Sequence, residues 1–186
     1  MEINNFYGNN VSFIQNLFFF DMELKSFCSY CKKNYLHYYI NYCSLDLEIK
    51  QTLKNNNIKI QNILSYNLIE DLNCECSKII KCKKQFRTLP KYLIIIIKQP
   101  KDQDYKFKMG ELIDLDINNY LIDNSNFKNK SKYELVSIMD NNLVIYCKSP
   151  INNKWYKYIE KDIKNIENIN TLMIAANLLI YRQIKT

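Results

Sequence analysis

The chain has 186 residues, of which 47% are hydrophobic, so it is long enough to form one globular domain with an apolar core. Its net charge of +7 comes from lysines spread along the sequence, which indicates a solvated surface, and we expect no sequence-specific nucleic-acid binding. No apolar run is long enough to span a bilayer and no secretory signal follows Met1, so we expect a protein that is neither secreted nor embedded in a membrane.

The first half of the chain mixes helical and strand patterns. Apolar residues recur at helical spacing over 11–27, which predicts a helix with Asn10 or Ser12 as its N-cap. A tyrosine-rich stretch with alternation near its end predicts a strand over 35–47. Near-helical spacing predicts a helix around 58–72, and a strand is expected over 83–88.

The second half has the pattern of a β-sheet. The β-branched run 92–97 predicts a strand covered on both faces, because it offers no polar side chain to water. Strands over 134–139 and 143–147 are expected to form a hairpin, since the intervening Asp140, Asn141 and Asn142 tolerate the positive φ of a tight turn. The other elements expected are an ordered segment at 113–121, strands at 155–158 and 178–182, and a loop at 163–169. Together these elements predict an α+β domain with an antiparallel sheet.

Seven cysteines without a secretory signal indicate thiols or zinc ligands rather than disulfides. Cys28-x-x-Cys31 has the spacing of a zinc-binding turn, and Cys74, Cys76 and Cys82 form a second, less regular group. We expect one structural zinc bound by Cys28, Cys31, Cys74 and Cys76, with Cys82 as an alternative to either member of the second pair. The competing interpretation is a set of buried or free thiols.

Four segments in order resemble the palm of the ubiquitin-specific protease family. The family pattern L-P-x-x-L-x-x-x-L-K corresponds to 89–98, although Gln99 and Pro100 replace the Arg-Phe that follows it. A Y-x-L pattern corresponds to 133–135, and the closing W-Y and A-Y-x-L-x-Y patterns correspond to 155–160 and 176–181. The two cysteine groups lie where the family carries its fingers.

The resemblance implies a reduced papain-like fold with a central antiparallel palm sheet, zinc-finger-like fingers and a shrunken helical thumb. It implies one miniature domain over 1–186, with a degraded form of the helix that bears the nucleophile at 1–27, fingers at 28–88 and the palm at 89–186. A rival alignment of the N-terminus matches Phe6-Tyr7-Gly8 to the segment before the fingers, but Gln15, Leu17 and Leu24 favour the first.

The family cleaves isopeptide bonds with a Cys–His–Asp/Asn triad, and the resemblance implies that this triad is lost here. Asn10 or Val11 stands at the position of the nucleophile, Asn142 lies in the turn that replaces the histidine loop, and Glu160 stands at the third position. Asparagine cannot act as a general base near neutral pH. The only histidine, His37, is expected to be a packed or surface residue.

The remaining cysteines of the strand patterns and several aromatic residues receive structural interpretations. Cys43 and Cys147 lie in strand patterns and are expected in the core. Trp155 and the tyrosines at 156, 158 and 181 are expected to pack in the sheet rather than to stack on nucleic-acid bases.

One branch of the family fits best, namely the catalytically inactive member associated with the spliceosomal tri-snRNP. That branch carries L-P-x-Y-L-I, as at 89–94, and V-D-L-x-x-Y-L, similar to 115–121. It usually lacks the finger cysteines, and it carries an N-terminal zinc-finger domain that this sequence does not show. We therefore expect a nuclear or nucleo-cytoplasmic scaffold in pre-mRNA splicing, with snRNP proteins as partners and ubiquitin as a further candidate. Two alternatives stay open: a ubiquitin carboxyl-terminal hydrolase or its fragment, and a non-catalytic ubiquitin-binding module.

Overall fold

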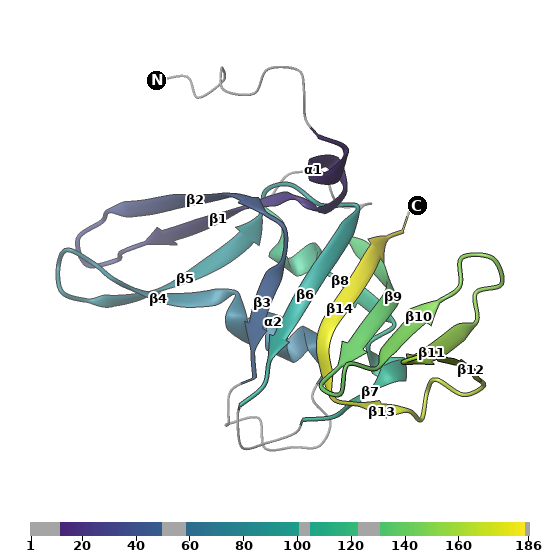
Figure 1. Cartoon of the computed structure of the whole chain (residues 1–186). Helices are drawn as coiled ribbons and strands as arrows, with labels where there is room; N and C mark the ends of the chain where they lie inside the picture. The colour runs from purple at the N-terminus through teal and green to yellow at the C-terminus, as the bar shows by residue number, and fades with distance from the viewer. Residues whose placement is uncertain (1–11, 50–58, 101–104, 123–130, 185–186) are drawn as a thin grey trace.

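The structure is a computed structural model that describes residues 12–49, 59–100, 105–122 and 131–184 (Figure 1). Most of its strands lie in two sheets, an eight-stranded palm and a four-stranded fingers sheet, and the α+β fold predicted from the sequence is confirmed. The palm has the order β12-β11-β10-β9-β14-β6-β3, with β8 pairing to β9, and the fingers have the order β2-β1-β5-β4. Among the described residues, no helix is long and apolar enough to cross a membrane.

The palm strands are β3 (Leu45–Glu48), β6 (Tyr92–Lys98), β8 (Asp114–Asp116), β9 (Lys132–Asp140), β10 (Ile145–Lys148), β11 (Trp155–Ile159), β12 (Asp162–Ile166) and β14 (Ala176–Gln183). The fingers strands are β1 (Phe20–Phe27), β2 (Asn34–Tyr42), β4 (Ile69–Asn73) and β5 (Ile79–Phe86). A small third sheet joins β7 (Phe107–Lys108) to β13 (Met173–Ile174). The helices are α1 (Phe13–Phe18) and α2 (Ile60–Asn67), with short 3-10 turns η1 (Met109–Glu111) and η2 (Asn118–Tyr120).

The predicted helix over 11–27 is wrong beyond its first turns. Ser12 caps α1 in a capping box with Gln15, but α1 ends at Phe18 and β1 begins at Phe20. In β1 the side chains of Phe20, Met22 and Leu24 alternate into the core with a period of two. The burial of these alternating residues outweighs the helical spacing of the same segment.

Two other elements of the first half are shorter than predicted. The strand expected over 35–47 is two strands in different sheets, β2 in the fingers and β3 in the palm, separated at Cys43 and Ser44. The helix expected around 58–72 is α2, which ends at Asn67 and continues directly into β4; residues 50–58 lie outside the described residues. The predicted strand over 83–88 is the second half of β5.

The palm is antiparallel, as predicted, for every strand pair except the one that includes β3 from the first half of the chain. β3 runs parallel to β6, with Leu45 opposite Ile95 and Leu47 opposite Ile97. Parallel neighbours need a long crossover, and here α2 and the strands β4 and β5 lie between β3 and β6 in the chain. The segment expected as a loop at 163–169 is also a strand in part, because β12 pairs with β11 over Asp162–Ile166.

The central strand β6 is confirmed, but only one of its faces is fully covered. Leu93, Ile95 and Ile97 are buried in the same apolar core as α2, whereas Ile94 and Ile96 are half-buried and are not part of that core. On the face of Ile96, one residue from each neighbouring strand lies directly opposite a residue of the next strand. The resulting row across the sheet is Ile96, Leu178, Met139, Ile145, Tyr158 and Ile163. We call this face, with Ile94 and Ile180 from the next row, the outer palm face.

Figure 1 shows α2 behind β3 and β6, while the opposite side of the palm faces the viewer. The prediction that both faces of 92–97 are covered is therefore wrong for the described part of the chain. Exposed apolar patches of this kind commonly mark binding surfaces.

The palm hairpin between β9 and β10 is confirmed, but its turn differs in detail from the prediction. The positive φ falls on Leu143 (60°) rather than on Asp140, Asn141 or Asn142. The buried Asp140 carboxylate orders the turn, because its Oδ1 accepts hydrogen bonds from the backbone N–H groups of Asn142 (2.8 Å) and Val144 (3.0 Å).

The predicted core positions of two cysteines are not observed. Cys43 is exposed between the two sheets, and Cys147 is half-buried on β10, where its Sγ lies 3.3 Å from the Ser137 hydroxyl. Both segments carry an alternating pattern, but each thiol falls on the side away from the core. Trp155 is buried and Tyr181 donates a hydrogen bond to the Leu112 carbonyl (2.8 Å), so these two residues pack as expected. Tyr156 is only half-buried and Tyr158 is exposed.

Replacing Ile95 by alanine should lower the free energy of unfolding by about 2–5 kcal/mol, because it leaves a cavity in a fully buried site. The matched control is Ile94→Ala on the same strand, which should cost only ~1 kcal/mol, since part of that side chain already contacts water. Urea denaturation of the two variants measures both values. Equal losses would show that the outer palm face is covered as tightly as the core.

Candidate metal centre and catalytic positions

The pairing of β1 with β5 brings two distant turns to the same end of the fingers. The register runs from Met22 opposite Phe86 to Lys25 opposite Lys83. The turn that follows β1 therefore lies beside the turn that precedes β5. These two turns carry the cysteines at positions 28 and 31 and at positions 74 and 76, at the tip of the fingers in Figure 1.

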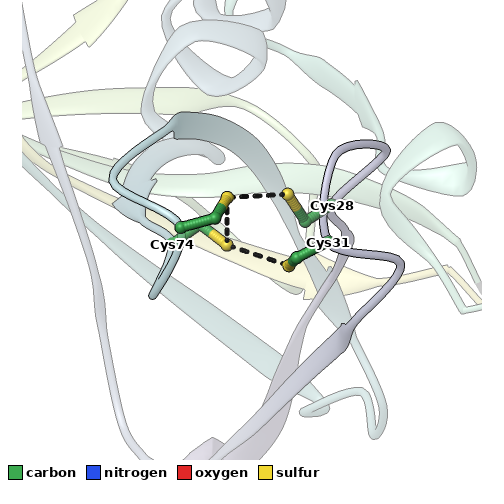
Figure 2. A group of neighbouring side chains, drawn as sticks. Cys28, Cys31 and Cys74 are labelled. Atoms are coloured by element: carbon green, nitrogen blue, oxygen red, sulfur yellow. Dashed lines mark hydrogen bonds between the residues drawn. The ribbon is translucent and has the colours of Figure 1, made fainter.

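The four sulfurs at this tip form one cluster. The Sγ atoms lie within 4.8 Å of one another, with 3.6 Å between Cys28 and Cys76, 3.3 Å between Cys31 and Cys74 and 3.1 Å between Cys74 and Cys76. Figure 2 shows Cys28 and Cys31 on one loop, pointing at the second loop that carries Cys74. Cys28 and Cys74 are buried, while Cys31 and Cys76 are half-buried.

Both turns have the same backbone design. A residue with positive φ follows each cysteine pair, Lys32 at 60° and Ser77 at 61°. Its backbone N–H donates to the carbonyl of the first cysteine, from Lys32 to Cys28 (2.9 Å) and from Ser77 to Cys74 (2.8 Å). These bonds fold each loop back on itself so that both of its sulfurs face the other loop.

Hydrogen bonds set the protonation of the cluster. The Tyr35 hydroxyl lies 3.0 Å from the Cys74 sulfur and lowers the pKa of that thiol to about 6, with help from the backbone N–H of Cys76. The Cys76 thiol donates to Cys74, and this hydrogen bond raises the pKa of Cys76 to about 12. Cys74 is thus the sulfur that most readily becomes a thiolate, the form that binds metal.

The four cysteines could bind a zinc ion. Zinc favours four thiolates in a tetrahedron with Zn–S bonds of about 2.3 Å, which places the sulfurs about 3.8 Å apart. The observed separations lie around this value, so small side-chain rotations would suffice. An ion pair between Lys33 and Glu75 also links the two loops.

The structure does not bring Cys82 or His37 into this cluster. Cys82 lies within β5, opposite Glu70, and its Sγ points at the Ile80 carbonyl (3.7 Å). His37 is exposed on β2, opposite Leu24. The choice between Cys76 and Cys82 depends on the hairpin register, which the cysteine spacing alone did not reveal.

The predicted positions of the triad are only partly visible. Val11 lies outside the described residues. Asn142 and Glu160 are both exposed, in the β9–β10 turn and the β11–β12 turn respectively. Since Ile145 pairs with Tyr158, these two turns lie at the same end of the palm. In the described part of the chain, this end carries no histidine.

A hollow of about 650 Å³ lies where the fingers meet the palm. Its lining includes Tyr39, Tyr42, Asp46 and Lys84, but neither Asn142 nor Glu160. The hollow is therefore separate from the two described catalytic positions, Asn142 and Glu160.

Replacing Cys74 by serine should abolish zinc binding and lower the thermal stability, because the site loses a ligand and zinc contributes its binding energy to folding. The matched control is Cys82→Ser, a buried thiol outside the cluster, which should retain one zinc per chain. Elemental analysis and thermal melting with and without a chelator measure both effects. Loss of zinc in Cys82→Ser, or no zinc in the unaltered chain, would contradict this assignment.

Acid should also release the metal, because protons compete for the sulfurs.

Comparison with solved structures finds close similarity of fold to the yeast SAGA deubiquitinating module. A structure of the SAGA Ubp8/Sgf11/Sus1/Sgf73 module bound to ubiquitin aldehyde matches 100% of this chain and 45% of that chain, with a TM-score of 0.69 and 18% identity. A Ubp8-mutant module bound to monoubiquitin and a yeast module with mutant Sgf73 each match 93% of this chain and 42% of theirs, with TM-scores of 0.67 and 18% identity. The chain thus spans less than half the length of these matched chains.

A search of curated proteins finds no match to this sequence. The profile of the ubiquitin carboxyl-terminal hydrolase family, by contrast, matches residues 4–181, which is nearly the whole sequence. The fold comparison agrees with this match over both the fingers and the palm. The chain belongs to the ubiquitin carboxyl-terminal hydrolase family.

Proposed function

We propose that this chain is a catalytically inactive ubiquitin-specific-protease domain that serves as a protein-binding scaffold. The observation that carries the proposal is the β9–β10 turn. By the resemblance, active members of the family carry a histidine in a loop between the corresponding two strands. Here Asp140 instead closes the two strands in a tight turn, because its carboxylate accepts hydrogen bonds from the turn backbone. A cysteine nucleophile needs a neighbouring base to form its thiolate.

Among the described residues, this end of the palm offers no histidine to act as that base. The only histidine, His37, is exposed on the fingers sheet, whereas the positions Asn142 and Glu160 lie at one end of the palm sheet. Glu160 is an exposed turn residue with a φ of 50°. A carboxylate in the third triad position orients a histidine, and this chain offers it none.

The outer palm face supports the binding part of the proposal. Its central residues Ile96, Leu178 and Met139 remain partly accessible, although they lie in the middle of the largest sheet. An apolar face in this position lowers the free energy of the protein when a partner covers it. A fold kept without its catalytic base, and with such a face, fits selection for binding.

We further propose that the partners are proteins of the spliceosomal tri-snRNP and that the chain acts in the nucleus or between nucleus and cytoplasm. The support is the sequence resemblance at 89–94 and 115–121 to the inactive branch of the family. In the structure the first segment leads into β6, and the second contains η2, whose neighbour Leu121 forms a bridge with Phe86 of the fingers. The branch-specific segments therefore lie at the junction of the palm and fingers.

A second candidate function is non-catalytic ubiquitin binding. Two of the structurally similar modules hold ubiquitin or its aldehyde, and the similarity covers both the fingers and the palm. Because the chain spans less than half of those matched chains, an active enzyme assembled with further protein segments is the third alternative.

The unaltered chain should not hydrolyse a ubiquitin C-terminal fluorogenic substrate above the rate of the buffer, and it should not react with a ubiquitin vinyl probe. Glu160→Ala should keep folding and partner binding unchanged, because the side chain is exposed and orients nothing. Turnover that disappears when one cysteine is replaced would contradict the proposal. A loss of partner binding in a folded Glu160→Ala variant would show that the third position still functions.

A further inference from the structure

The sulfurs at the tip of the fingers contact one another across the two loops. Cys31 of the first loop lies 3.3 Å from Cys74 of the second loop, and Cys28 lies 3.6 Å from Cys76. Figure 2 shows these two contacts as the dashed lines that cross between the loops. Each pair combines one buried sulfur, Cys74 or Cys28, with one half-buried sulfur that solvent can reach. We call these four residues the fingertip cluster.

We propose that the fingertip cluster is a site of reversible oxidation by a hydroperoxide, which converts its thiolates into two cross-loop disulfides, Cys31–Cys74 and Cys28–Cys76, and releases the zinc ion. This inference goes beyond the binding functions proposed above and does not depend on them. A site of this kind needs an accessible sulfur that meets the oxidant and a neighbouring sulfur that resolves the product. Both cross-loop pairs meet this requirement.

The more accessible sulfur of each pair reacts first. The Cys31 thiolate attacks one oxygen of hydrogen peroxide, the O–O bond breaks and hydroxide leaves, so that Cys31 becomes a sulfenic acid. The Cys74 thiolate then attacks the Cys31 sulfur, and a second hydroxide leaves as the S–S bond forms and the S–O bond breaks. One peroxide thus accepts two electrons from the pair, and the short contact favours the disulfide over further oxidation of Cys31.

The second pair reacts in the same way, with Cys76 as the accessible sulfur and Cys28 as the resolving sulfur. In total, four thiolates and two peroxide molecules give two disulfides and four hydroxides, while the zinc ion keeps its charge. The ion leaves because it binds thiolates, and a disulfide offers it none. A thiol reductant reverses both disulfides and restores the metal site.

The backbone keeps the two loops closed without help from the metal. The backbone N–H of Cys28 donates to the Lys33 carbonyl (2.9 Å), and the backbone N–H of Cys74 donates to the Lys78 carbonyl (2.8 Å). The ion pair between Lys33 and Glu75 also joins the loops through protein groups alone. The sulfurs therefore still face each other across the loops after zinc has left.

A pairing within one loop is the competing outcome. Cys74 and Cys76 are also in contact, at 3.1 Å. A disulfide between two residues separated by one position closes a small ring, which strains the preferred disulfide geometry. The short contacts printed by the first loop, from Cys28 and from Cys31, both cross to the second loop. These two features favour the cross-loop pairs.

Cross-loop disulfides would join the same two loops that zinc joins. Cys31 and Cys74 are 43 positions apart in the sequence, and closing so long a loop restricts the unfolded chain. The fingertip is therefore held together by zinc in its reduced form and by disulfides in its oxidised form. Disulfides within each loop would also release zinc, but they would leave the two loops unlinked.

Oxidation of the zinc-loaded chain with a small excess of hydrogen peroxide tests the proposal. Zinc should be released, as measured with a chromogenic chelator, and non-reducing peptide mass spectrometry should find links between positions 31 and 74 and between 28 and 76. A reductant should restore the thiols and zinc binding. The oxidised chain should also melt at a higher temperature than the reduced chain stripped of zinc, because the links restrict its unfolded state.

Three outcomes would overturn the proposal. One is linkage within a loop, at 28–31 or 74–76. Another is sulfinic or sulfonic acid on the cluster, which a thiol reductant does not reverse. The third is a cluster whose thiols persist in peroxide that oxidises the exposed Cys43, a thiol outside the cluster.

Replacing Cys74 by serine removes the resolving sulfur of Cys31. The Cys31 sulfenic acid should then persist and react with dimedone by about tenfold or more over the unaltered chain. The matched control is Cys43→Ser, which should leave both links and the low labelling of Cys31 unchanged. Equal labelling of Cys31 in all three proteins would overturn the proposal. The link map of the unaltered chain decides the pairing even where Cys74→Ser loses its fingertip structure.

Discussion

Burial of one face of the palm sheet is the interaction on which the rest of the structure depends. Leu93, Ile95 and Leu179 lie on adjacent strands of this face and are fully buried. The same core includes Phe20 and Phe86 from the base of the fingers, so it joins the two sheets into one unit. Apolar burial supplies most of the favourable free energy of folding, and here one continuous core supplies it for both parts.

The tip of the fingers lies beyond that core and is stabilised in another way. Cys28 and Cys74 are buried at a turn, where only two short loops and their neighbouring strands are available to cover them. A zinc ion would cross-link the loops and compensate for the small amount of apolar surface, as in other small metal-bound units. The hydrogen bond from Tyr35 to Cys74 already favours the thiolate that such an ion requires.

The sequence predicted the palm better than the fingers. The run that forms β6 is short, rich in β-branched isoleucine and flanked by Pro90 and Pro100, and these features favour a buried strand over a buried helix. The segment that forms β1 was ambiguous, since Leu24 satisfies both a helical and an alternating pattern. The position of Leu24 opposite Lys84 of β5 decided the outcome, and a contact 60 residues away is not visible in local spacing.

The candidate site was likewise predicted only in part from the sequence. Sequence spacing identified Cys28 and Cys31, but the choice between Cys76 and Cys82 required the register of β4 against β5. The role of Asp140 was missed, although an aspartate two residues before an Asn in a predicted turn is a recognised turn signal. The uncovered outer palm face could not be predicted, because a β-branched run does not reveal which of its faces the remaining chain covers.

The retained core and the closed β9–β10 turn are the two observations behind the proposed function, a scaffold that binds through its surface rather than through chemistry. The partly exposed row that begins at Ile96 and continues through Met139 is where such a partner would gain most from apolar contact. In this account the catalytic end of the palm can change freely, whereas the outer palm face cannot.

Affinity purification followed by mass spectrometry tests this account most directly, using the unaltered chain, Ile96→Lys on the outer palm face and Ile79→Lys on an exposed part of the fingers. The account predicts that the unaltered chain and Ile79→Lys recover the same snRNP proteins, and that a folded Ile96→Lys variant loses them. Recovery of ubiquitin conjugates in place of snRNP proteins, or identical recovery by all three proteins, would contradict it.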